Sequence, residues 1–353
     1  MALMLDARAL LRPAQADAAA LEQAAQAVEQ AARALASGAL VGLPTETVYG
    51  LAADADQAEA VGRIFAAKGR PKDHPLIVHL AGATPQQWRA GAEHYAHELP
   101  DFAEKLMQAF WPGPLTLILP RRPEVGAAAA GGQDSIGLRC PAHPVAQALL
   151  QACQDLGVHG LAAPSANRFG RVSPTSAAHV SDEFDAQLSD QELLILDGGA
   201  CPVGIESTIV DCSRGRPVLL RPGMIGLEAL QAALGMPVAL RDQAAPKASG
   251  TLESHYAPAA RVRLMPHAEI QAALELLGAD ARQIAIYTRA PVSSASPHLL
   301  LRYMPTGAEA CAQELFAVLR ELDQPEIKLI WVEAPPADAA WDGVRDRLQR
   351  AAA

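Results

Sequence analysis

The order of apolar and polar positions predicts a chain of short strands that alternate with helices. Residues 17–37 are rich in Ala, Leu and Glu, carry Leu21 and Leu35 on one face, and stop at Gly38. We therefore predict a helix here that leads into a strand at residues 39–43. Further apolar runs of strand length follow at residues 76–80, 115–119, 136–140, 160–163, 193–196, 207–212 and 218–220.

Helical patterns separate several of these runs, notably at residues 144–156 and 229–234. Asp56-Gln-Ala-Glu59 has the form of a capping box for another helix, which should end near Lys68 and Gly69. Strands and helices that alternate in this way predict an α/β domain built on an open, twisted mixed sheet.

The pattern changes after the first 235 residues. Periodicity fades between residues 236 and 260, where Pro, Gly, Ala and Ser predominate, so we interpret this segment as a linker. Beyond it, predicted strands and helices alternate again, which favours a smaller, Rossmann-like parallel α/β domain. The predicted strands lie at residues 261–265, 283–287 and 328–332, with helices between them, one of them near 308–322, and a last helix after them. The sequence thus predicts domains at residues 1–235 and 261–353, joined by a linker at 236–260.

Composition supports two compact domains and argues against one class of partner. The chain has 353 residues, of which 50% are hydrophobic, enough to build two cores. Its formal net charge is −10, so attraction of a nucleic-acid backbone by bulk charge is not expected. Anionic ligands must instead be bound locally, by a few Lys and Arg side chains in a pocket.

Cysteine usage and the apolar runs indicate the compartment. The five cysteines are odd in number and show no C-x-x-C spacing, which suggests neither a disulfide framework nor a zinc site. No basic start precedes an apolar stretch, and no run of 18 apolar residues occurs. We expect a cytoplasmic protein that neither crosses nor binds a membrane.

The densest polar cluster lies between a predicted helix end and a predicted strand. Lys68, Arg70, Lys72 and His74 fall within seven residues, and neither a P-loop nor a G-x-G-x-x-G motif is present elsewhere. These cations could neutralise phosphates, Arg by a bidentate fork and Lys as a point charge. A solvated helix end that complements the helix dipole is an equally weighted alternative.

Polar side chains also gather at the ends of other predicted strands. The segments 163–167 and 204–208 carry Ser, Asn and Thr, which can donate to phosphate, ribose or carboxylate oxygens, although turns use the same residues. Arg139 and Arg221 each end an apolar run, where a buried charge needs an anionic ligand or a protein carboxylate. No Gly-x-Ser-x-Gly elbow is present, which argues against a serine acyl nucleophile.

Taken together, these segments closely resemble the threonylcarbamoyl-AMP synthase family in its long, two-domain form. The resemblance spans about 200 residues in the family's order, whereas the C-terminal part matches mainly in length, position and the motif His255-Tyr256-Ala-Pro258. The matching strings are Leu43-Pro-Thr-Glu-Thr-Val-Tyr-Gly50, Lys68-Gly-Arg-Pro, His74-Pro-Leu-Ile-Val-His79, Trp111-Pro-Gly-Pro-Leu-Thr116, Arg139-Cys-Pro-Ala-His-Pro144, Pro164-Ser-Ala-Asn167, Ser173-Pro-Thr175, Ile205-Glu-Ser-Thr208 and Arg221-Pro-Gly223.

The resemblance implies that residues 1–235 are the catalytic domain of an L-threonylcarbamoyladenylate synthase, a nucleotidyltransferase. Such an enzyme joins L-threonine, bicarbonate and ATP, with Mg²⁺ on the nucleotide, into L-threonylcarbamoyl-AMP, pyrophosphate and water. The product serves threonylcarbamoyladenosine modification of the tRNA anticodon loop. A downstream threonylcarbamoyl transferase complex is the implied partner, and direct tRNA binding is expected to be weak or absent.

The resemblance also implies roles for single residues. L-Threonine would be surrounded by Thr47, His79, Arg139, Ser165 and Ser207. The nucleotide would be held by Arg70, His74, Ser135, Asn167, Thr175, Arg221 and Tyr256, with Lys68 near the reacting phosphate and Lys68 and Arg70 as the catalytic cations. The linker departs from some relatives because it lacks their basic string, in which Met-Lys-Tyr is followed by Lys or Arg.

The linker itself invites a functional interpretation, and other functions stay open. His255 and Tyr256 stand in a segment with no local core to join, so we expect them to close over an occupied site, although a plain spacer is the alternative. An RNA-binding module and a non-catalytic regulator are possible on the same fold. A carbamoyl-transfer enzyme of hydrogenase maturation would need zinc-finger cysteines and an acylphosphatase-like segment, which are not found here.

Overall fold

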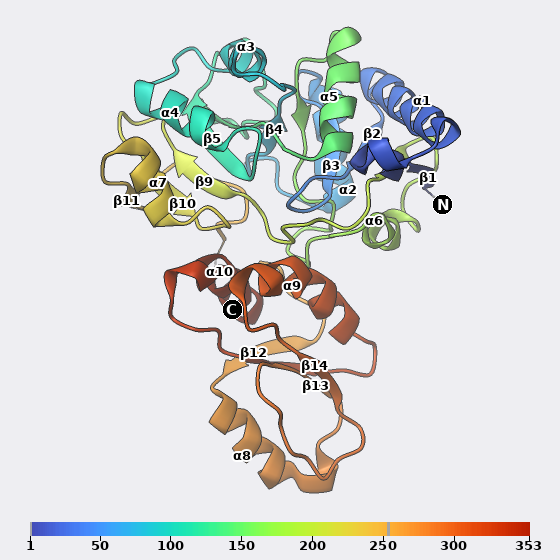
Figure 1. Ribbon diagram of the computed structural model, residues 1–353, viewed down its shortest axis with the longest axis vertical. Coiled ribbons are helices and arrows are strands. Elements are labelled where there is room, and N and C mark those ends of the chain that lie inside the picture. Colours follow the sequence, from blue (N-terminus) through green and yellow to red (C-terminus); the bar gives the residue numbers. More distant parts are fainter. Residues whose placement is uncertain (1, 253–254) are drawn as a thin grey trace. The chain divides into compact units, whose positions relative to one another are not determined.

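A computed structural model describes residues 2–252 and 255–353, which form two compact units (Figure 1). The first unit comprises residues 1–169, 173–202 and 206–251, and the second comprises 170–172, 203–205 and 252–353. Of the predicted linker, residues 236–251 thus belong to the first unit, and residues 252 and 255–260 belong to the second. Glu253 and Ser254 of that linker lie outside the described residues.

The first unit is built on one mixed sheet, as the sequence predicted. Its strands follow the order β1-β8-β2-β3-β7-β4-β6-β5-β9-β10-β11. The sheet contains both parallel pairs, such as β4 with β6, and antiparallel pairs, such as β5 with β6. The strands are β1 Leu3–Asp6, β2 Leu40–Leu43, β3 Gly50–Asp54, β4 Ile77–His79, β5 Leu115–Pro120, β6 Ser135–Arg139, β7 Leu161–Ala162, β8 Leu193–Asp197, β9 Thr208–Asp211, β10 Val218–Arg221 and β11 Ala239–Leu240.

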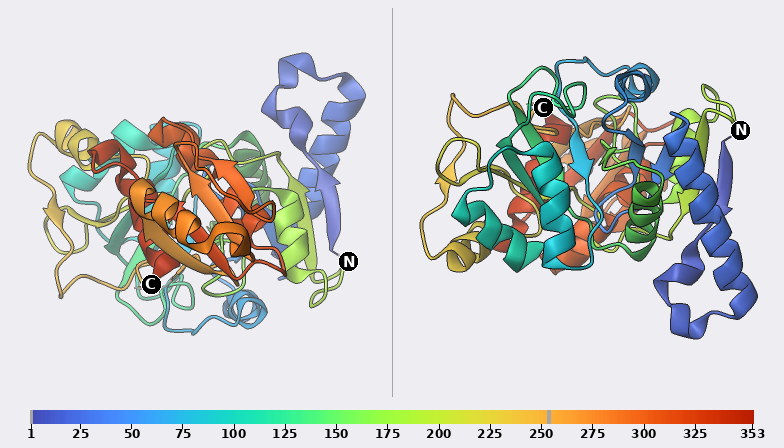
Figure 2. Two further views of the ribbon diagram at one scale, coloured as in Figure 1. Left: turned by 90° about the horizontal axis from the view of Figure 1, so that it is seen from below. Right: turned by 90° about the horizontal axis from the view of Figure 1, so that it is seen from above.

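Helices cover both faces of this sheet. They are α1 Ala18–Ala36, α2 Ala58–Lys68, α3 Pro85–Tyr95, α4 Asp101–Phe110, α5 Pro144–Asp155, α6 Ala177–Phe184 and α7 Leu227–Leu234. Two short 3-10 helices, η1 Arg8–Leu11 and η2 Pro13–Gln15, precede α1, and this segment stands out from the rest of the first unit (Figure 2). In the described part of the chain, no helix is both long and apolar enough to span a membrane.

Alternation along the central strands divides the core into two layers. In β3, Leu51 and Ala53 join one buried cluster, whereas Ala52 between them joins the cluster on the opposite face. The second cluster is closed by α1 and α5, which pack against each other. Because both faces are covered, the central strands are apolar at almost every position rather than at every second one.

The second unit is the smaller parallel α/β domain that the sequence predicted. Its four strands run in the order β12-β15-β13-β14, and each neighbouring pair is parallel. One helix, α8, lies on one face of this sheet, and α9 and α10 lie on the other (Figure 1). The elements are β12 Arg261–Met265, α8 His267–Leu277, η3 Gly278–Asp280, β13 Ile284–Thr288, β14 Leu300–Tyr303, α9 Ala308–Leu322, β15 Leu329–Glu333, η4 Ala339–Trp341 and α10 Asp342–Ala352.

One local prediction in the first unit is wrong. The structure has no capping box at Asp56, because α2 begins at Ala58 and its N-cap, Gln57, makes no side-chain cap hydrogen bond. The Asp56 carboxylate instead accepts hydrogen bonds from the Tyr95 hydroxyl at 3.0 Å and from the Gly126 N–H at 3.1 Å. The carboxylate therefore joins two distant segments rather than capping its own helix.

A close backbone contact fixes the connection that follows β10. A Cβ atom at Gly223 would lie 2.6 Å from the backbone nitrogen of Thr208, the first residue of β9. The Thr208 hydroxyl also donates to the Ile225 carbonyl at 2.9 Å and accepts from the Ile225 N–H at 3.2 Å. Because backbone cannot move aside as a flexible side chain can, only glycine fits at position 223.

We therefore predict that Gly223→Ala destabilises the fold. The added methyl group must displace backbone, so the free energy of unfolding should fall by about 1–3 kcal/mol, the usual cost of overpacking. Gly62→Ala is the control, because a Cβ there meets nothing within 4 Å and Gly62 lies inside α2. That change should stabilise by about 0.5–1 kcal/mol. Urea unfolding of both variants measures the difference, and equal stabilities would contradict the prediction.

Candidate functional site

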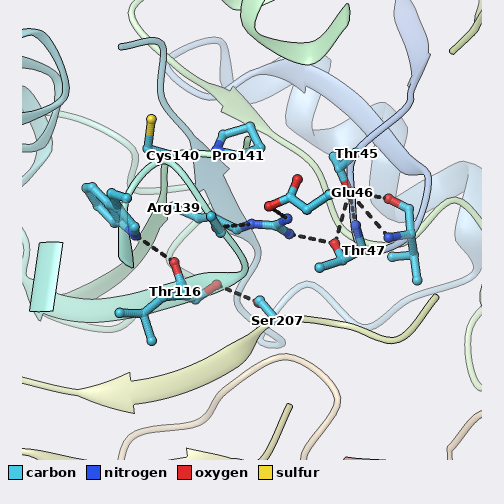
Figure 3. Close-up of polar contacts among 12 residues, drawn as sticks. Thr45, Glu46, Thr47, Thr116, Arg139, Cys140, Pro141 and Ser207 are labelled. Atoms are coloured by element: carbon cyan, nitrogen blue, oxygen red, sulfur yellow. Dashed lines mark hydrogen bonds and ion pairs between the residues drawn. The ribbon is translucent and has the colours of Figure 1, made fainter. Parts of the chain in front are cut away.

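A buried arginine at the end of β6 organises one part of the candidate site (Figure 3). Arg139 is 4% exposed, and its Nη2 lies 2.7 Å from Oε1 of Glu46, on the connection between β2 and β3. Its Nη1 donates to the Thr47 hydroxyl at 2.8 Å, and its Nε donates to the Gly113 carbonyl at 3.3 Å. The sequence left open whether an anionic ligand or a protein carboxylate compensates the charge of Arg139. The structure shows a protein carboxylate, that of Glu46.

The Thr45 side chain fixes the connection that carries Glu46 and Thr47. Its hydroxyl donates to the Val48 carbonyl at 2.6 Å and lies 2.9 Å from the Thr47 hydroxyl. It also accepts from the Thr47 N–H at 3.2 Å. The hydrogen bonds therefore run from Arg139 through the two threonine hydroxyls to a backbone carbonyl, which holds Thr47 toward the guanidinium.

Several buried polar atoms here have hydrogen-bonding capacity to spare. The Arg139–Glu46 contact is close but not aligned as a hydrogen bond, so Nη2 of Arg139 and both Glu46 carboxylate oxygens have no hydrogen-bond partner in residues 2–252 and 255–353. Nδ1 of His79 also has no hydrogen-bond partner among the described residues. His79 lies opposite Arg139 in the register of the neighbouring strands β4 and β6. Buried polar groups are normally satisfied, so these atoms indicate a place for a polar ligand.

His79 is held in its neutral form. Burial, and then the positive charge of Arg139, lower the pKa of His79 to about 3. A neutral imidazole can donate or accept a hydrogen bond without adding a charge to the site.

A second group of contacts links β5, β9 and β10. The hydroxyls of Ser207 and Thr116 lie 2.7 Å apart, and both side chains are buried. Arg221, the last residue of β10, donates to the Ser207 carbonyl at 2.8 Å through Nη2 and to the Ser249 carbonyl at 2.9 Å through Nη1. The Ser207 hydroxyl lies 3.1 Å from Nη2 as well. The guanidinium thus joins the start of β9 to the segment that follows β11.

Lys68 is buried at the end of α2 and is held by backbone carbonyls. Its Nζ donates to the carbonyl of Ser165 at 2.5 Å and also to that of Asn167. Burial, and then the nearby charge of Arg70, hold the pKa of Lys68 well below its ordinary value. Lys68 makes no ion pair in the part of the chain that the structure describes. Such a cation gains most from an anion that enters the site.

Arg70 and Arg221 meet at the same serine. Nη2 of Arg70 donates to the Pro75 carbonyl at 2.9 Å and lies 3.4 Å from the Ser249 hydroxyl, while its guanidinium carbon lies 5.6 Å from the Phe169 ring centre. His74 packs edge-on against that ring, with 5.4 Å between centres. Ser249 therefore lies between two of the predicted nucleotide-binding arginines.

A small pocket opens beside this serine. Strands β5 and β6 contribute Thr116, Ser135 and Gly137 to its wall, and residues 247–249 line it as well. These residues are anchored by reciprocal bonds between Lys247 and Gln133, at 2.8 and 3.1 Å, and by an ion pair of 2.7 Å between Lys247 and Asp73. The first half of the predicted linker thus lies on the first unit, next to Ser135.

The remaining predicted residues are distributed over both units. The Asn167 side-chain nitrogen donates to the Arg168 carbonyl at 2.7 Å, and the Thr175 N–H donates to Nδ1 of His179 at 3.2 Å. Tyr256 belongs to the second unit, where its ring centre lies 5.3 Å from that of Phe316. The expectation that this segment has no local core to join is therefore wrong, because Tyr256 is buried against α9. Its nucleotide contact stays a prediction.

Sequence reasoning missed three side chains in this region. Glu46 falls within the motif Leu43-Pro-Thr-Glu-Thr-Val-Tyr-Gly50 but was given no role. A carboxylate between two threonines in an otherwise apolar segment could have indicated a buried polar site. Thr116 resembled an ordinary strand residue. Ser249 stands in a segment without periodicity, so the sequence offered no reason to select it.

Comparison with known proteins yields consistent matches. Residues 33–223 match the Sua5/YciO/YrdC family model, described as "Telomere recombination", and residues 225–353 match the model "Threonylcarbamoyl-AMP synthase, C-terminal domain". The threonylcarbamoyl-AMP synthase of Pyrococcus abyssi is 37% identical over 89% of this chain and 90% of its own length. The protein of the same name from Bacillus subtilis is 36% identical, with 89% of both chains covered.

Solved structures agree with these matches. A variant of P. abyssi Sua5 superposes with a TM-score of 0.85 at 32% identity, covering all of this chain and 96% of its own. P. abyssi Sua5 complexed with L-threonine superposes with a TM-score of 0.83, again at 32% identity, covering all of this chain and 97% of its own.

The buried His79 predicts a distinct dependence of stability on pH. An unfolded histidine has a pKa of about 6.5, and the folded value is about 3. Because the folded pKa is lowered, the stabilisation is complete above about pH 6.5 and is lost as pH falls toward 3, by up to about 1.4 kcal/mol per unit.

Urea unfolding at about pH 7 and about pH 5 tests this prediction. The wild type should lose about 2 kcal/mol more than His79→Gln over that interval. His97→Gln, at an exposed position of the same unit, should keep the wild-type dependence. If His79→Gln and the wild type lose equal stability, His79 is not the buried neutral group described here.

Proposed function

The chain belongs to the threonylcarbamoyl-AMP synthase family, and we propose that it joins L-threonine, bicarbonate and ATP into L-threonylcarbamoyl-AMP, releasing pyrophosphate and water. The observation that carries this proposal is the Arg139 site, where a buried guanidinium donates to the Thr47 hydroxyl and lies within electrostatic reach of the neutral His79. Nη2 of Arg139 and Nδ1 of His79 have no hydrogen-bond partner among the described residues. An amino acid with a hydroxyl side chain needs this set of partners.

On the threonine side, Arg139 binds the carboxylate through its Nη2, which has no hydrogen-bond partner within the described ranges. Thr47 and Ser207 offer hydroxyls, and His79 offers its Nδ1, to the substrate's polar groups. Ser165 forms a backbone bridge with Gly50, three residues after Thr47 at the start of β3, and we assign its hydroxyl to the same substrate. The P. abyssi protein whose structure was solved with L-threonine has the same fold at 32% identity.

On the nucleotide side, buried cations neutralise the phosphates. Lys68 lies near the reacting phosphate, and Arg70 and Arg221, which meet at Ser249, hold the remaining phosphate charge. Ser135, His74, Asn167 and Thr175 of the first unit complete the nucleotide contacts.

The reaction needs positioning more than a protein nucleophile. The threonine amine and bicarbonate form a carbamate and water, and a carbamate oxygen then attacks the α-phosphorus of ATP in line with the leaving pyrophosphate. The bond that forms is carbamate O–P, and the bond that breaks joins the α-phosphorus to the bridging oxygen of pyrophosphate. Fixed cations and donors stabilise the charge that develops on the phosphoryl oxygens. Because the reaction transfers the adenylyl group of ATP to the carbamate, we classify the enzyme as a nucleotidyltransferase.

Mg²⁺ enters this proposal with the nucleotide. In residues 2–252 and 255–353, no group of three or more His, Cys, Asp or Glu side chains is arranged to hold a metal ion. We propose that the ATP phosphates carry the ion. No step of the reaction above is derived through it.

The product is an activated intermediate rather than an end product. We propose that it passes to a threonylcarbamoyl transferase complex, which uses it to modify the tRNA anticodon loop. The net charge of −10 supports transfer of a small molecule rather than direct binding of tRNA by this chain.

Pyrophosphate release tests the function and the role of Arg70 together. Release by the wild type should require threonine, bicarbonate and ATP, and release without threonine would contradict the function. Arg70→Ala should lower the rate about tenfold to hundredfold, because charged hydrogen bonds in a dry site are worth about 1.5–3 kcal/mol. Lys72→Ala removes an exposed cation two residues away and should leave the rate unchanged. Equal rates for Arg70→Ala and Lys72→Ala would show that Arg70 does not contribute to the site.

Arg139 should contribute to the affinity for threonine rather than to the affinity for ATP. Arg139→Lys keeps a positive charge beside Glu46 but loses the planar fork, so it avoids leaving a buried carboxylate uncompensated. Calorimetry should show that threonine affinity falls about tenfold or more, whereas affinity for a non-hydrolysable ATP analogue changes by less than about twofold. If the analogue loses affinity and threonine does not, the two subsites are wrongly assigned.

A further inference from the structure

Glu46 is a buried carboxylate to which the proposed function assigns no role. It is 6% exposed and touches the guanidinium of Arg139 through Oε1, at 2.7 Å from Nη2. Neither of its oxygens has a hydrogen-bond partner among the described residues. A carboxylate placed only to hold Arg139 would be expected to form aligned, bidentate hydrogen bonds. Arg139 is moreover already held at its other two nitrogens, by Thr47 and Gly113.

The groups around Glu46 leave it as the site's proton acceptor. Arg139 provides a permanent positive charge at the end of β6. Burial lowers the pKa of His143, which precedes α5, so that imidazole is neutral and a weak base. Burial raises the pKa of the Cys140 thiol to about 12 and that of the Cys201 thiol further, so both stay protonated. These three groups all lie within electrostatic reach of Glu46.

A zwitterionic substrate fits this adjacency of charges. The ammonium and carboxylate of an amino acid are attached to the same carbon, so their protein partners must also be neighbours. The 2.7 Å contact places one carboxylate oxygen of Glu46 against the nitrogen of Arg139 that has spare capacity. A bound zwitterion can thus direct its carboxylate to Arg139 and its ammonium to Glu46 without leaving either buried charge unpaired.

We propose that Glu46 binds the ammonium group of L-threonine and accepts the proton that carbamate formation releases. This inference rests on the proposed function. The ammonium form of threonine and bicarbonate give the carbamate, water and one proton, with a new N–C bond and loss of one C–O bond of bicarbonate. The carboxylate of Glu46 takes that proton and returns it to solvent after product release. The amine can attack carbon only after it loses its ammonium proton, so an acceptor beside it is required.

Calorimetry with two ligands separates this role from simple support of Arg139. The ligands are L-threonine and 3-hydroxybutyrate, which keeps the carboxylate and hydroxyl but lacks the amine. In Glu46→Gln, affinity for threonine should fall about tenfold or more, and affinity for 3-hydroxybutyrate should change less than about twofold. If both ligands lose affinity equally, Glu46 only orients Arg139 and the proposal is overturned. If the wild type does not bind threonine, the proposed function fails with it.

The pH dependence of synthesis tests proton transfer. At saturating threonine, Glu46→Gln should synthesise the product more slowly than the wild type, and the ratio of the two rates should approach one as pH rises. At high pH, solvent removes the ammonium proton without help from the carboxylate. A ratio that stays constant with pH overturns the proton-accepting role. Full synthesis by Glu46→Gln would overturn the inference while leaving the proposed function intact.

A second variant guards against loss of the fold. Glu46→Asp keeps a negative charge beside Arg139 and withdraws it by one methylene group. Thermal unfolding should show a folded protein, and threonine affinity should fall while affinity for 3-hydroxybutyrate is retained. Unchanged threonine affinity in a folded Glu46→Asp would show that the position of the carboxylate does not matter, and would contradict ammonium binding.

Discussion

The buried ion pair between Arg139 and Glu46 is the constraint on which the site depends. Taking both charges out of water is costly, and their attraction offsets that cost only while each has the other. The guanidinium also needs the Thr47 hydroxyl and the Gly113 carbonyl, which lie on separate connections between strands. The conformations of the β2–β3 connection and of the segment before β5 are therefore tied to the charge at the end of β6.

The strands were predictable where burial on both faces made the sequence uniformly apolar. Each apolar run predicted for the first unit corresponds to an observed strand. The three strands predicted for the second unit are observed as β12, β13 and β15, whereas its fourth strand, β14, was not predicted. In the first unit, strands β1, β3 and β11 were not predicted. Strand β3 was missed because Gly50-Leu-Ala-Ala-Asp54 has few residues with strand preference. It is a strand because it pairs with both β2 and β7, which is a tertiary cause that a local pattern does not contain.

The sequence predicted that Arg139 and Arg221 end strands, but it did not predict what these two side chains contact. Arg139 and Arg221 were identified as charges at strand ends, yet two different environments satisfy them. A carboxylate meets Arg139, whereas the carbonyls of Ser207 and Ser249 accept from Arg221. Neither partner follows from the local sequence, because folding brings Glu46 and Ser249 in from remote segments. For the same reason the core around Tyr256, formed with Phe316 of α9, could not be anticipated.

The way in which buried cations are compensated matches the two proposed substrates. Arg139 faces a carboxylate, so that part of the site is close to neutral and suits a zwitterion, whose own charges also cancel. The hydrogen-bond partners of Lys68 are neutral carbonyls. Burial and Arg70 oppose its charged form more than the nearby carboxylates of Glu183 and Glu206 favour it. An uncancelled buried charge is unfavourable alone, as the lowered pKa of Lys68 indicates, and becomes favourable when a polyanion enters. A polyanion bound at the position proposed for the phosphates would therefore favour the charged form of Lys68. A carboxylate paired with Lys68 would stabilise the empty protein, but the phosphates would then have to displace it.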